Sequence, residues 1–153
     1  MAGDAASVRD ATEADLPRLV ELLGHLAPQG EEREDPSQSG LYVAAFRDIA
    51  ADPRQRLLVL EAGRRILGSL ALIIVPNLSH TGRPWAQVEN VVVDETARSR
   101  GYGEQLMRYA LDAAREAGCY KLVLTSNKQR SDAHRFYTRI GFGATHEGFR
   151  HDL

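Results

Sequence analysis

The 153-residue chain lacks the features that mark several special classes of protein. Its single cysteine, Cys119, excludes an internal disulfide and fits a reducing compartment. Its longest apolar run, residues 70–76, is far too short to span a bilayer. The first residues show no basic segment followed by an apolar one, which a secretory signal would need. We therefore expect a cytoplasmic protein that does not insert into a membrane.

The charge of the chain has no strong bias either. The formal net charge is −2 at pH 7, from 19 basic and 21 acidic residues. Without a global basic field, general binding to nucleic acid or to an anionic membrane is not expected, so an anionic ligand must be held by a local arrangement. The composition, with 43% hydrophobic and 26% charged residues, is that of an ordinary soluble protein, and the length predicts one domain over residues 1–153.

Metal-binding patterns are missing as well. A protein metal site needs several ligands at suitable spacing, commonly histidines and cysteines. The histidines of this chain show no such spacing: His25, His80, His134, His146 and His151. We predict no metal site.

The sequence does contain an alternation of strand-like and helix-like segments. Apolar residues recur at helical spacing between Leu16 and Leu26, and Pro17 favours Asp15 as the N-cap because proline is best tolerated in the first turn. Gly118 stands where the glycine that ends a helix belongs. On this basis we predict helices over about 16–26, 41–51, 103–117 and 131–140, with Ser131 capping the last, and strands over 7–10, 57–62, 66–75, 87–93, 120–125 and from Phe142 to the end. Residues 28–40 and 76–84 are expected to be loops, the first of them mobile.

These segments predict a mixed α/β sheet. Gly63, Arg64 and Arg65 join the strands at 57–62 and 66–75, which indicates an antiparallel hairpin. The segment 87–125 runs strand, helix, strand, and such a crossover makes its two strands parallel. We therefore predict a mostly antiparallel central sheet with one parallel pair and with helices on both faces.

One segment of the sequence indicates a site for phosphate groups. The run Val91–Val93 leads through a loop, Arg98–Gly103, into the helix predicted at 103–117. Two glycines allow tight turns and free backbone N–H groups, and a helix N-terminus adds unpaired donors and partial positive charge. Arg98 and Arg100 bring formal charge to the same place. Together these features predict a pyrophosphate site.

Two common pyrophosphate motifs fit this segment poorly. A dinucleotide-binding fingerprint requires a third glycine three residues after Gly103, where the chain has Leu106. The phosphate loop of nucleotide hydrolases requires Gly-Lys followed by Ser or Thr at the helix start, and neither occurs here. The pattern that fits is Arg-x-x-Gly-x-Gly after a valine-rich strand, over Arg98–Gly103.

This pattern resembles the acetyl-CoA loop of the GNAT superfamily of N-acetyltransferases. The resemblance continues in Leu122–Asn127, Ala133–Tyr137 and Ile140–Phe142, which are similar to the second cofactor-contacting segment of that superfamily. The order of the earlier elements matches too, so the likeness covers nearly the whole chain. The resemblance implies a GNAT-like fold whose parallel strands splay apart, with acetyl-CoA as the co-substrate.

The resemblance also implies how acetyl-CoA is held. Pantetheine would pair with backbone groups of Val91 and Val93, the pyrophosphate would lie on the amides of residues 100–104, and Asn127 would bind the pantetheine arm. The residues expected to contact the cofactor are therefore Val91, Val92, Val93, Arg98, Ser99, Arg100, Gly101, Tyr102, Gly103, Glu104 and Asn127.

Three further residues are candidates for the chemistry. The resemblance implies that Tyr137 protonates the leaving CoA thiolate; the alternative is an aromatic side chain packed beside Phe136. Glu89, a carboxylate in an otherwise apolar strand, is the candidate base for the amine, directly or through a water. Asn90 would point to the opposite face of the sheet. We expect one of this pair to face the substrate, Glu89 as the base or Asn90 as a binding residue, and the alternative is a polar pair at a strand edge.

Sequence and resemblance together predict an N-acetyltransferase. No nucleophile with a paired base is apparent, so we expect direct transfer from acetyl-CoA to a primary amine of a small molecule. The segment Asn127–Tyr137 is similar to members that act on amino-sugar phosphates or aminoalkyl phosphonates. The alternatives are a protein lysine or N-terminus as the acceptor, and a catalytically silent CoA-binding module. The resemblance also implies a homodimer.

Overall fold

The computed structural model describes residues 5–26 and 34–153. The chain divides into two compact units, Met1–Val123 and Leu124–Leu153, and each is described by itself. The prediction of a single domain over residues 1–153 therefore stays a prediction. The mobile loop expected at 28–40 lies partly outside the described residues, because these resume at residue 34.

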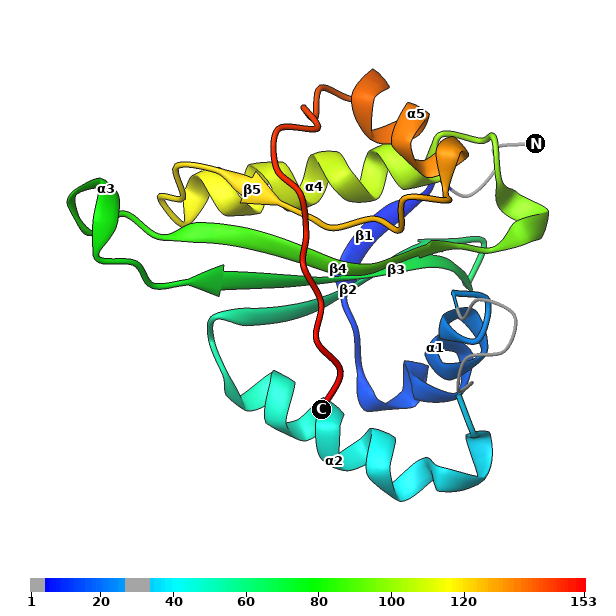
Figure 1. The fold of residues 1–153 in the computed structure, drawn as a ribbon. Coiled ribbons are helices and arrows are strands. Elements are labelled where there is room, and N and C mark those ends of the chain that lie inside the picture. The colour runs from blue at the N-terminus through cyan, green and yellow to red at the C-terminus, as the bar shows by residue number, and fades with distance from the viewer. Residues whose placement is uncertain (1–4, 27–33) are drawn as a thin grey trace. The chain divides into compact units, whose positions relative to one another are not determined.

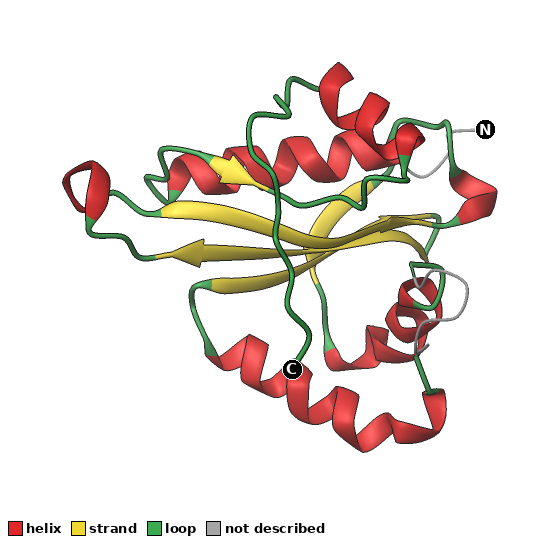
Figure 2. Ribbon diagram, viewed as in Figure 1, coloured by secondary structure: helices red, strands yellow, loops and turns green. Residues whose placement is uncertain are grey.

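The first unit is built on a five-stranded mixed sheet (Figure 2). Its strands follow the order of the chain across the sheet, namely β1 (Ser7–Asp10), β2 (Gln55–Ala62), β3 (Arg65–Val75), β4 (Trp85–Val93) and β5 (Leu122–Val123). All neighbours are antiparallel except β4 and β5, which are parallel. The predicted mixed sheet with one parallel pair is confirmed.

Helices cover both faces of this sheet, as predicted. Figure 1 shows α1 (Leu16–Leu23) and α2 (Ser39–Ala51) on one side and α4 (Tyr102–Glu116) on the other. A short helical turn, α3 (Ser79–Gly82), lies at the end of the sheet where β3 meets β4. Helix α5 (Ser131–Arg139) belongs to the second unit.

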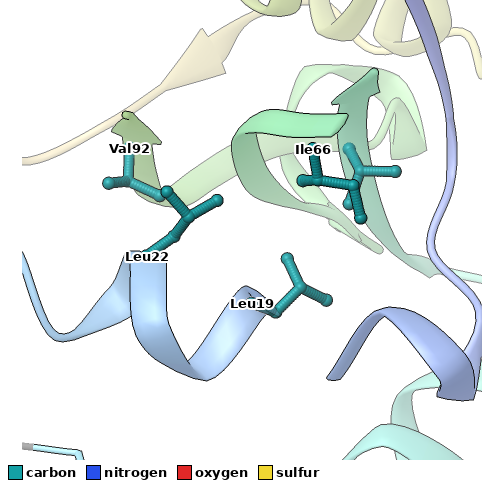
Figure 3. Packing of buried hydrophobic residues seen from close by; sticks show 5 residues of the cluster. Leu19, Leu22, Ile66 and Val92 are labelled. Atoms are coloured by element: carbon teal, nitrogen blue, oxygen red, sulfur yellow. The ribbon is translucent and has the colours of Figure 1, made fainter. Parts of the chain in front are cut away.

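Helix α1 packs on its side of the sheet through an apolar stripe. Leu19 and Leu22 meet Val59, Ile66 and Val92 in a buried cluster (Figure 3). The helical spacing of the apolar residues in the sequence produces this stripe, and burying it is what holds the helix on the sheet.

Helix α4 lies close against the opposite face. Its residues Leu106 and Met107 are fully buried. A β-carbon added at Gly68 of β3 would stand 2.8 Å from Leu106 Cδ1 and 3.1 Å from the carbonyl oxygen of Val92. Glycine at position 68 therefore leaves room for Leu106, because a side chain there would press on Leu106 and on the Val92 carbonyl.

The turns that connect these elements follow the expected local chemistry. Gly63 and Arg64 both have positive φ, 58° and 62°, as a two-residue hairpin turn with the right twist requires. Gly118, with φ 77°, ends α4, and the N–H of Cys119 donates to the Ala114 carbonyl while that of Gly118 donates to Arg115.

Asp15 does stand at the N-cap of α1, but its carboxylate does not cap that helix. It accepts hydrogen bonds from the backbone and hydroxyl of Thr12 and pairs with Arg9. The reason is that a 3-10 turn, Glu13–Asp15, runs directly into the helix, so the carboxylate reaches back to the start of that turn.

Several predicted boundaries are wrong. The strand expected at 120–125 is only Leu122–Val123, and the chain from Phe142 onward forms no regular element. Glycines in this last segment lower its strand preference, and a strand without a paired neighbour has no ladder to stabilise it. Ser131 is the first residue of α5 and not its N-cap, which is Arg130. Helix α2 begins at Ser39, since a 3-10 turn leads into it.

Candidate active site

Strand β4 contains a bulge at the polar pair singled out in the sequence. Ser69 of β3 pairs with Val92, and Ala71 pairs with Glu89, so Asn90 and Val91 together oppose one residue. Asn90 has φ 54°, in the left-handed region that asparagine tolerates better than most residues. Sequence reasoning missed this bulge, although an asparagine inside a valine-rich strand is a signal for it.

The bulge changes which way the side chains of β4 point. Ser69 and Ala71 lie on one face of β3, so their partners Val92 and Glu89 share a face although they are three residues apart. Val92 packs against α1, and Glu89 therefore faces the α1 side of the sheet. The expectation that Asn90 points to the side opposite Glu89 stays a prediction.

The carboxylate of Glu89 is held by one neighbour on its own strand. Gln87, two residues earlier and on the same face, donates from Nε2 to Glu89 Oε1. Both side chains are half-buried. The other carboxylate oxygen, Oε2, has no hydrogen-bond partner among the residues that the structure describes, so it is available to accept a proton from a ligand or a water.

The end of β4 is fixed by a buried carboxylate. Asp94 accepts from the backbone N–H of Thr96 at 2.8 Å and from its hydroxyl at 2.6 Å, and the Arg18 guanidinium of α1 donates to Oδ2. These contacts hold the pKa of Asp94 well below its ordinary value. Arg18 also donates from Nε to the Ile66 carbonyl at 3.1 Å. Strand β3, strand β4 and α1 thus meet where the loop begins.

The loop after β4 has the backbone geometry of an anion site. Ser99 and Gly101 have φ 64° and 79°, on either side of Arg100, and Gly101 is the N-cap of α4. The N–H of Gln105 donates to the Gly101 carbonyl at 3.0 Å, so the N–H groups of residues 102–104 precede the first helical bond. They face outward at the positive end of the helix dipole.

Charge at this loop comes from two exposed arginines. Arg98 stands 3.9 Å from Glu95, a loose contact, and Arg100 forms no ion pair among the described residues. Glu104 turns its carboxylate along the helix to Arg108 at 2.6 Å, which leaves its backbone N–H as the group it offers to a ligand. The donor set therefore fits a pyrophosphate.

The second unit contains two more of the candidate site residues, Asn127 and Tyr137. Asn127 Oδ1 accepts from the N–H of Gln129 at 2.9 Å, which shapes the turn before α5 and leaves the Nδ2 amide as a donor. The Tyr137 ring makes edge contacts with Phe136 at 5.2 Å and Phe142 at 5.9 Å between centroids. Its ring is thus held by packing between these two aromatic side chains.

Two kinds of feature are absent from the part of the chain that the structure describes. The described residues contain no group of three histidine, cysteine or acidic side chains that could hold a metal ion. None of their helices is long and apolar enough to cross a membrane.

Comparison with known proteins decides the family. Residues 17–142 match the model of the acetyltransferase (GNAT) family. The chain is 34% identical to a glucosamine 6-phosphate N-acetyltransferase of Trypanosoma brucei brucei, over 95% of each protein. The chain belongs to the GNAT acetyltransferase family.

Two further proteins are similar to this chain. The aminoalkylphosphonate N-acetyltransferase of Salmonella typhimurium is 33% identical over 69% of this chain and 70% of the relative. A crystal structure of a transcriptional regulator from Bacillus halodurans C-125 is 37% identical, with TM-score 0.90 over 97% of this chain and 100% of that one.

Family membership confirms the reaction class predicted from Arg98–Gly103. The protein is a GNAT acyltransferase, and the named relatives acetylate amines of small molecules. Members of the family use acetyl-CoA.

Proposed function

We propose that this protein transfers acetyl from acetyl-CoA to the primary amine of a small molecule that also carries a phosphate or phosphonate group. The observation that carries the proposal is the loop at the end of β4, with left-handed Ser99 and Gly101 and free N–H groups at the start of α4. The two enzymes described above act, by name, on glucosamine 6-phosphate and on aminoalkylphosphonates. Both kinds of acceptor join an amine to a phosphoryl group.

The loop residues bind the pyrophosphate of acetyl-CoA in this proposal. The N–H groups of residues 100–104 donate to its oxygens, and Arg98, Ser99 and Arg100 add charge and a hydroxyl. Acetyl-CoA supplies the activated acetyl group as a thioester. Glycine at 101 and 103 keeps the backbone accessible, since a side chain there would stand between donors and phosphate.

The backbone of Val91, Val92 and Val93 is proposed to bind the pantetheine arm. Pairing between β4 and β5 stops at Gln87 and Val123, so no β5 ladder occupies the edge of β4 beyond that point. An unpaired strand edge presents N–H and C=O groups that can pair with the amides of pantetheine. We assign the donor amide of Asn127 to the same arm.

Two side chains are proposed to move protons. Glu89 accepts the proton that the ammonium of the acceptor must lose, directly or through a water, with Gln87 holding one carboxylate oxygen in place. Asn90, at the bulge, is proposed to contact the acceptor. Tyr137 donates its hydroxyl proton to the sulfur of the departing thiolate. The rings of Phe136 and Phe142 fix the plane of the phenol.

We further propose a homodimer that works in the cytoplasm and binds neither nucleic acid nor membrane. The small net charge and the single cysteine support the choice of compartment and the exclusion of polyanionic partners. Light scattering on the purified protein measures the mass of the assembly, and a monomeric mass would contradict the dimer.

A silent CoA-binding module is the second candidate, favoured by the regulator structure at 37% identity. A protein amine as acceptor is the remaining alternative. One assay of CoA thiol release distinguishes these three functions. The acceptors are glucosamine 6-phosphate, 2-aminoethylphosphonate and a lysine-rich peptide. We expect turnover with at least one phosphoryl amine and none with the peptide. Acetyl-CoA binding without any turnover would support the module instead.

A further inference from the structure

The turn between β5 and α5 is tied to the helix by a histidine that has no part in the proposed acetyl transfer. His134 of α5 places Nε2 2.9 Å from the backbone carbonyl oxygen of Asn127, seven residues earlier in the chain. A carbonyl oxygen can only accept a hydrogen bond, so Nε2 carries the proton and donates it. This bond joins α5 to the residue that is proposed to hold the pantetheine arm.

Three hydrogen bonds converge on Asn127. Its carbonyl oxygen also accepts from the Arg130 N–H at 3.0 Å, and its side-chain oxygen Oδ1 accepts from the Gln129 N–H at 2.9 Å. These last two bonds are local, and they shape the turn itself. The bond from His134 comes from a side chain of the helix, so it sets how the turn stands against α5.

Helix α5 also carries Tyr137, three residues after His134. Residues three apart are neighbours on one face of a helix. Thr138 donates from Oγ1 to the His134 carbonyl at 2.9 Å, and the Tyr137 ring packs against Phe136 and Phe142. Because one helix holds both side chains, fixing the turn against α5 also fixes the Asn127 amide relative to the proposed acid.

Stability alone gives this bond little purpose. His134 and Asn127 are both exposed, and a hydrogen bond that water can replace contributes little to the free energy of unfolding. A ligand gains more from it. If the turn were free to change its orientation, acetyl-CoA would have to order it on binding, and that ordering lowers affinity.

We propose that His134 is a positioning residue for acetyl-CoA, which holds the turn at Asn127 so that its Nδ2 amide donates to the pantetheine arm. This inference rests on the proposed function, because that function assigns Asn127 to the cofactor. His134 does not touch acetyl-CoA in this arrangement. It acts through the backbone of Asn127, so its removal should alter cofactor affinity more than the chemical step.

The test uses two substitutions of His134 and one matched control. His134→Ala removes the donor, and His134→Gln restores an N–H donor at the end of a side chain of similar reach. The control is His146→Ala, because His146 is an exposed imidazole of the same unit whose Nδ1 lies 2.7 Å from the Thr145 hydroxyl. Calorimetry measures the affinity of each protein for acetyl-CoA, and steady-state rates with glucosamine 6-phosphate give kcat and the KM of each substrate.

We expect His134→Ala to weaken the affinity for acetyl-CoA, and to raise its KM, by about fivefold to tenfold, the loss that corresponds to one hydrogen bond. The kcat at saturating acetyl-CoA and the KM for the amine should stay near the wild-type values, since bound cofactor orders the turn. His134→Gln should recover most of the affinity, and His146→Ala should behave like the wild type.

A double-mutant cycle shows whether His134 acts through Asn127. Asn127→Asp keeps an oxygen that can accept from the Gln129 N–H but removes the Nδ2 donor. With that donor gone, adding His134→Ala should weaken acetyl-CoA binding no further. Losses that simply add would overturn the proposal, because they would place the effect of His134 elsewhere.

Two other results would also overturn the proposal. One is an unchanged affinity for acetyl-CoA in His134→Ala. The other is a loss that His134→Gln does not restore, which would assign the effect to the ring and not to its N–H group. Failure of the proposed function looks different, because the wild type would then bind acetyl-CoA and acetylate no amine, while the affinities would still decide the role of His134.

Discussion

The two ends of β4 present positive charge in different ways. At its carboxyl end the candidate site is made of backbone, where positive φ at Ser99 and Gly101 and the start of α4 aim N–H groups outward. At its amino end the charge belongs to a side chain, Lys121, whose Nζ lies within cation–π range of the rings of Trp85 and Tyr120. A backbone site accepts any phosphate that fits, whereas a side-chain site can be changed by one substitution.

Both ends depend on a contact between residues far apart in the chain. Arg18 fixes Asp94 at the carboxyl end, and His80 fixes Tyr120 at the amino end. The first contact is ionic and largely buried, and the second is a stack of two rings at the surface. Breaking them should therefore have effects of different size and kind.

Gly101→Val should have the largest effect, at the backbone site. Valine at φ 79° is strained, and relief of that strain redirects the N–H donors, so the affinity for acetyl-CoA should fall about a hundredfold or more. Calorimetric titration measures it. The matched control is Gly63→Val, which has similar strain at φ 58° and open space in a distant turn. Equal loss of affinity in both variants would contradict the assignment of the loop.

Tyr137→Phe should slow the chemical step and leave binding at both ends of β4 unchanged. Without the phenol proton the thiolate leaves less easily, and kcat should fall about a hundredfold while the affinity for acetyl-CoA is kept. Steady-state rates and a binding titration check this. Tyr109→Phe serves as control, since the Tyr109 hydroxyl accepts a hydrogen bond from Arg56 and has no proposed role in the reaction. An unaffected rate in the Tyr137 variant would remove the residue from the mechanism.

Glu89→Gln should lower kcat by a smaller factor, about tenfold to a hundredfold. The amide keeps the shape of the side chain and its place beside Gln87 but cannot take a proton from the amine. The KM for acetyl-CoA and the KM for the acceptor amine should both change little, because the substitution leaves the groups proposed to bind them in place. Glu116→Gln, at the exposed end of α4, is the control. A normal kcat would show that water or another group is the base.

Asp94→Asn should reduce the free energy of unfolding by about 2 kcal/mol at pH 7, because a charged hydrogen-bonding partner of Arg18 is lost. The folded protein holds the pKa of Asp94 below its ordinary value, so its stabilisation is present above about pH 4 and is lost as the pH falls further. Denaturant unfolding should show the gap between the two proteins closing in acid.

The matched control for this prediction is Asp112→Asn, which breaks an exposed pair with Arg115 at 2.7 Å. Surface pairs contribute little, so a change below about 0.5 kcal/mol is expected. A gap between wild type and Asp94→Asn that is the same at every pH would show that shape, and not charge, is what Asp94 provides.

His80→Ala should have the smallest effect, at the side-chain site. Losing one ring stack frees Tyr120, so the free energy of unfolding should fall by about 1 kcal/mol or less, and the affinity for acetyl-CoA should be unchanged. Denaturant unfolding measures the change. His151→Ala, exposed near the end of the chain, is the control. A loss of acetyl-CoA affinity in the His80 variant would contradict the division between the two ends.

The parts that could be predicted from sequence are those determined by neighbouring residues. The loop Arg98–Gly103 and the helix that follows are visible because glycines, a valine run and a helix start lie within one short segment. The hairpin at Gly63 and the end of α4 at Gly118 are local in the same way. The family resemblance then extended these local predictions to the whole fold.

The parts that could not be predicted depend on partners distant in sequence. Arg18 and Asp94 are 76 residues apart, and nothing in either segment indicates the other. The bulge at Asn90 changes the facing of β4, and an assumption of strict alternation passes over it. The segment after Phe142 reads as a strand, but strand formation requires a neighbour to pair with, which no local pattern supplies.

The claim that the loop after β4 binds acetyl-CoA is tested most directly by thermal unfolding with and without ligand. A ligand that binds only the folded protein raises the midpoint of unfolding by mass action. We predict a clear rise with acetyl-CoA, no rise with NAD, and no rise with acetyl-CoA for Gly101→Val. An unchanged midpoint for the wild type at millimolar acetyl-CoA would contradict the account.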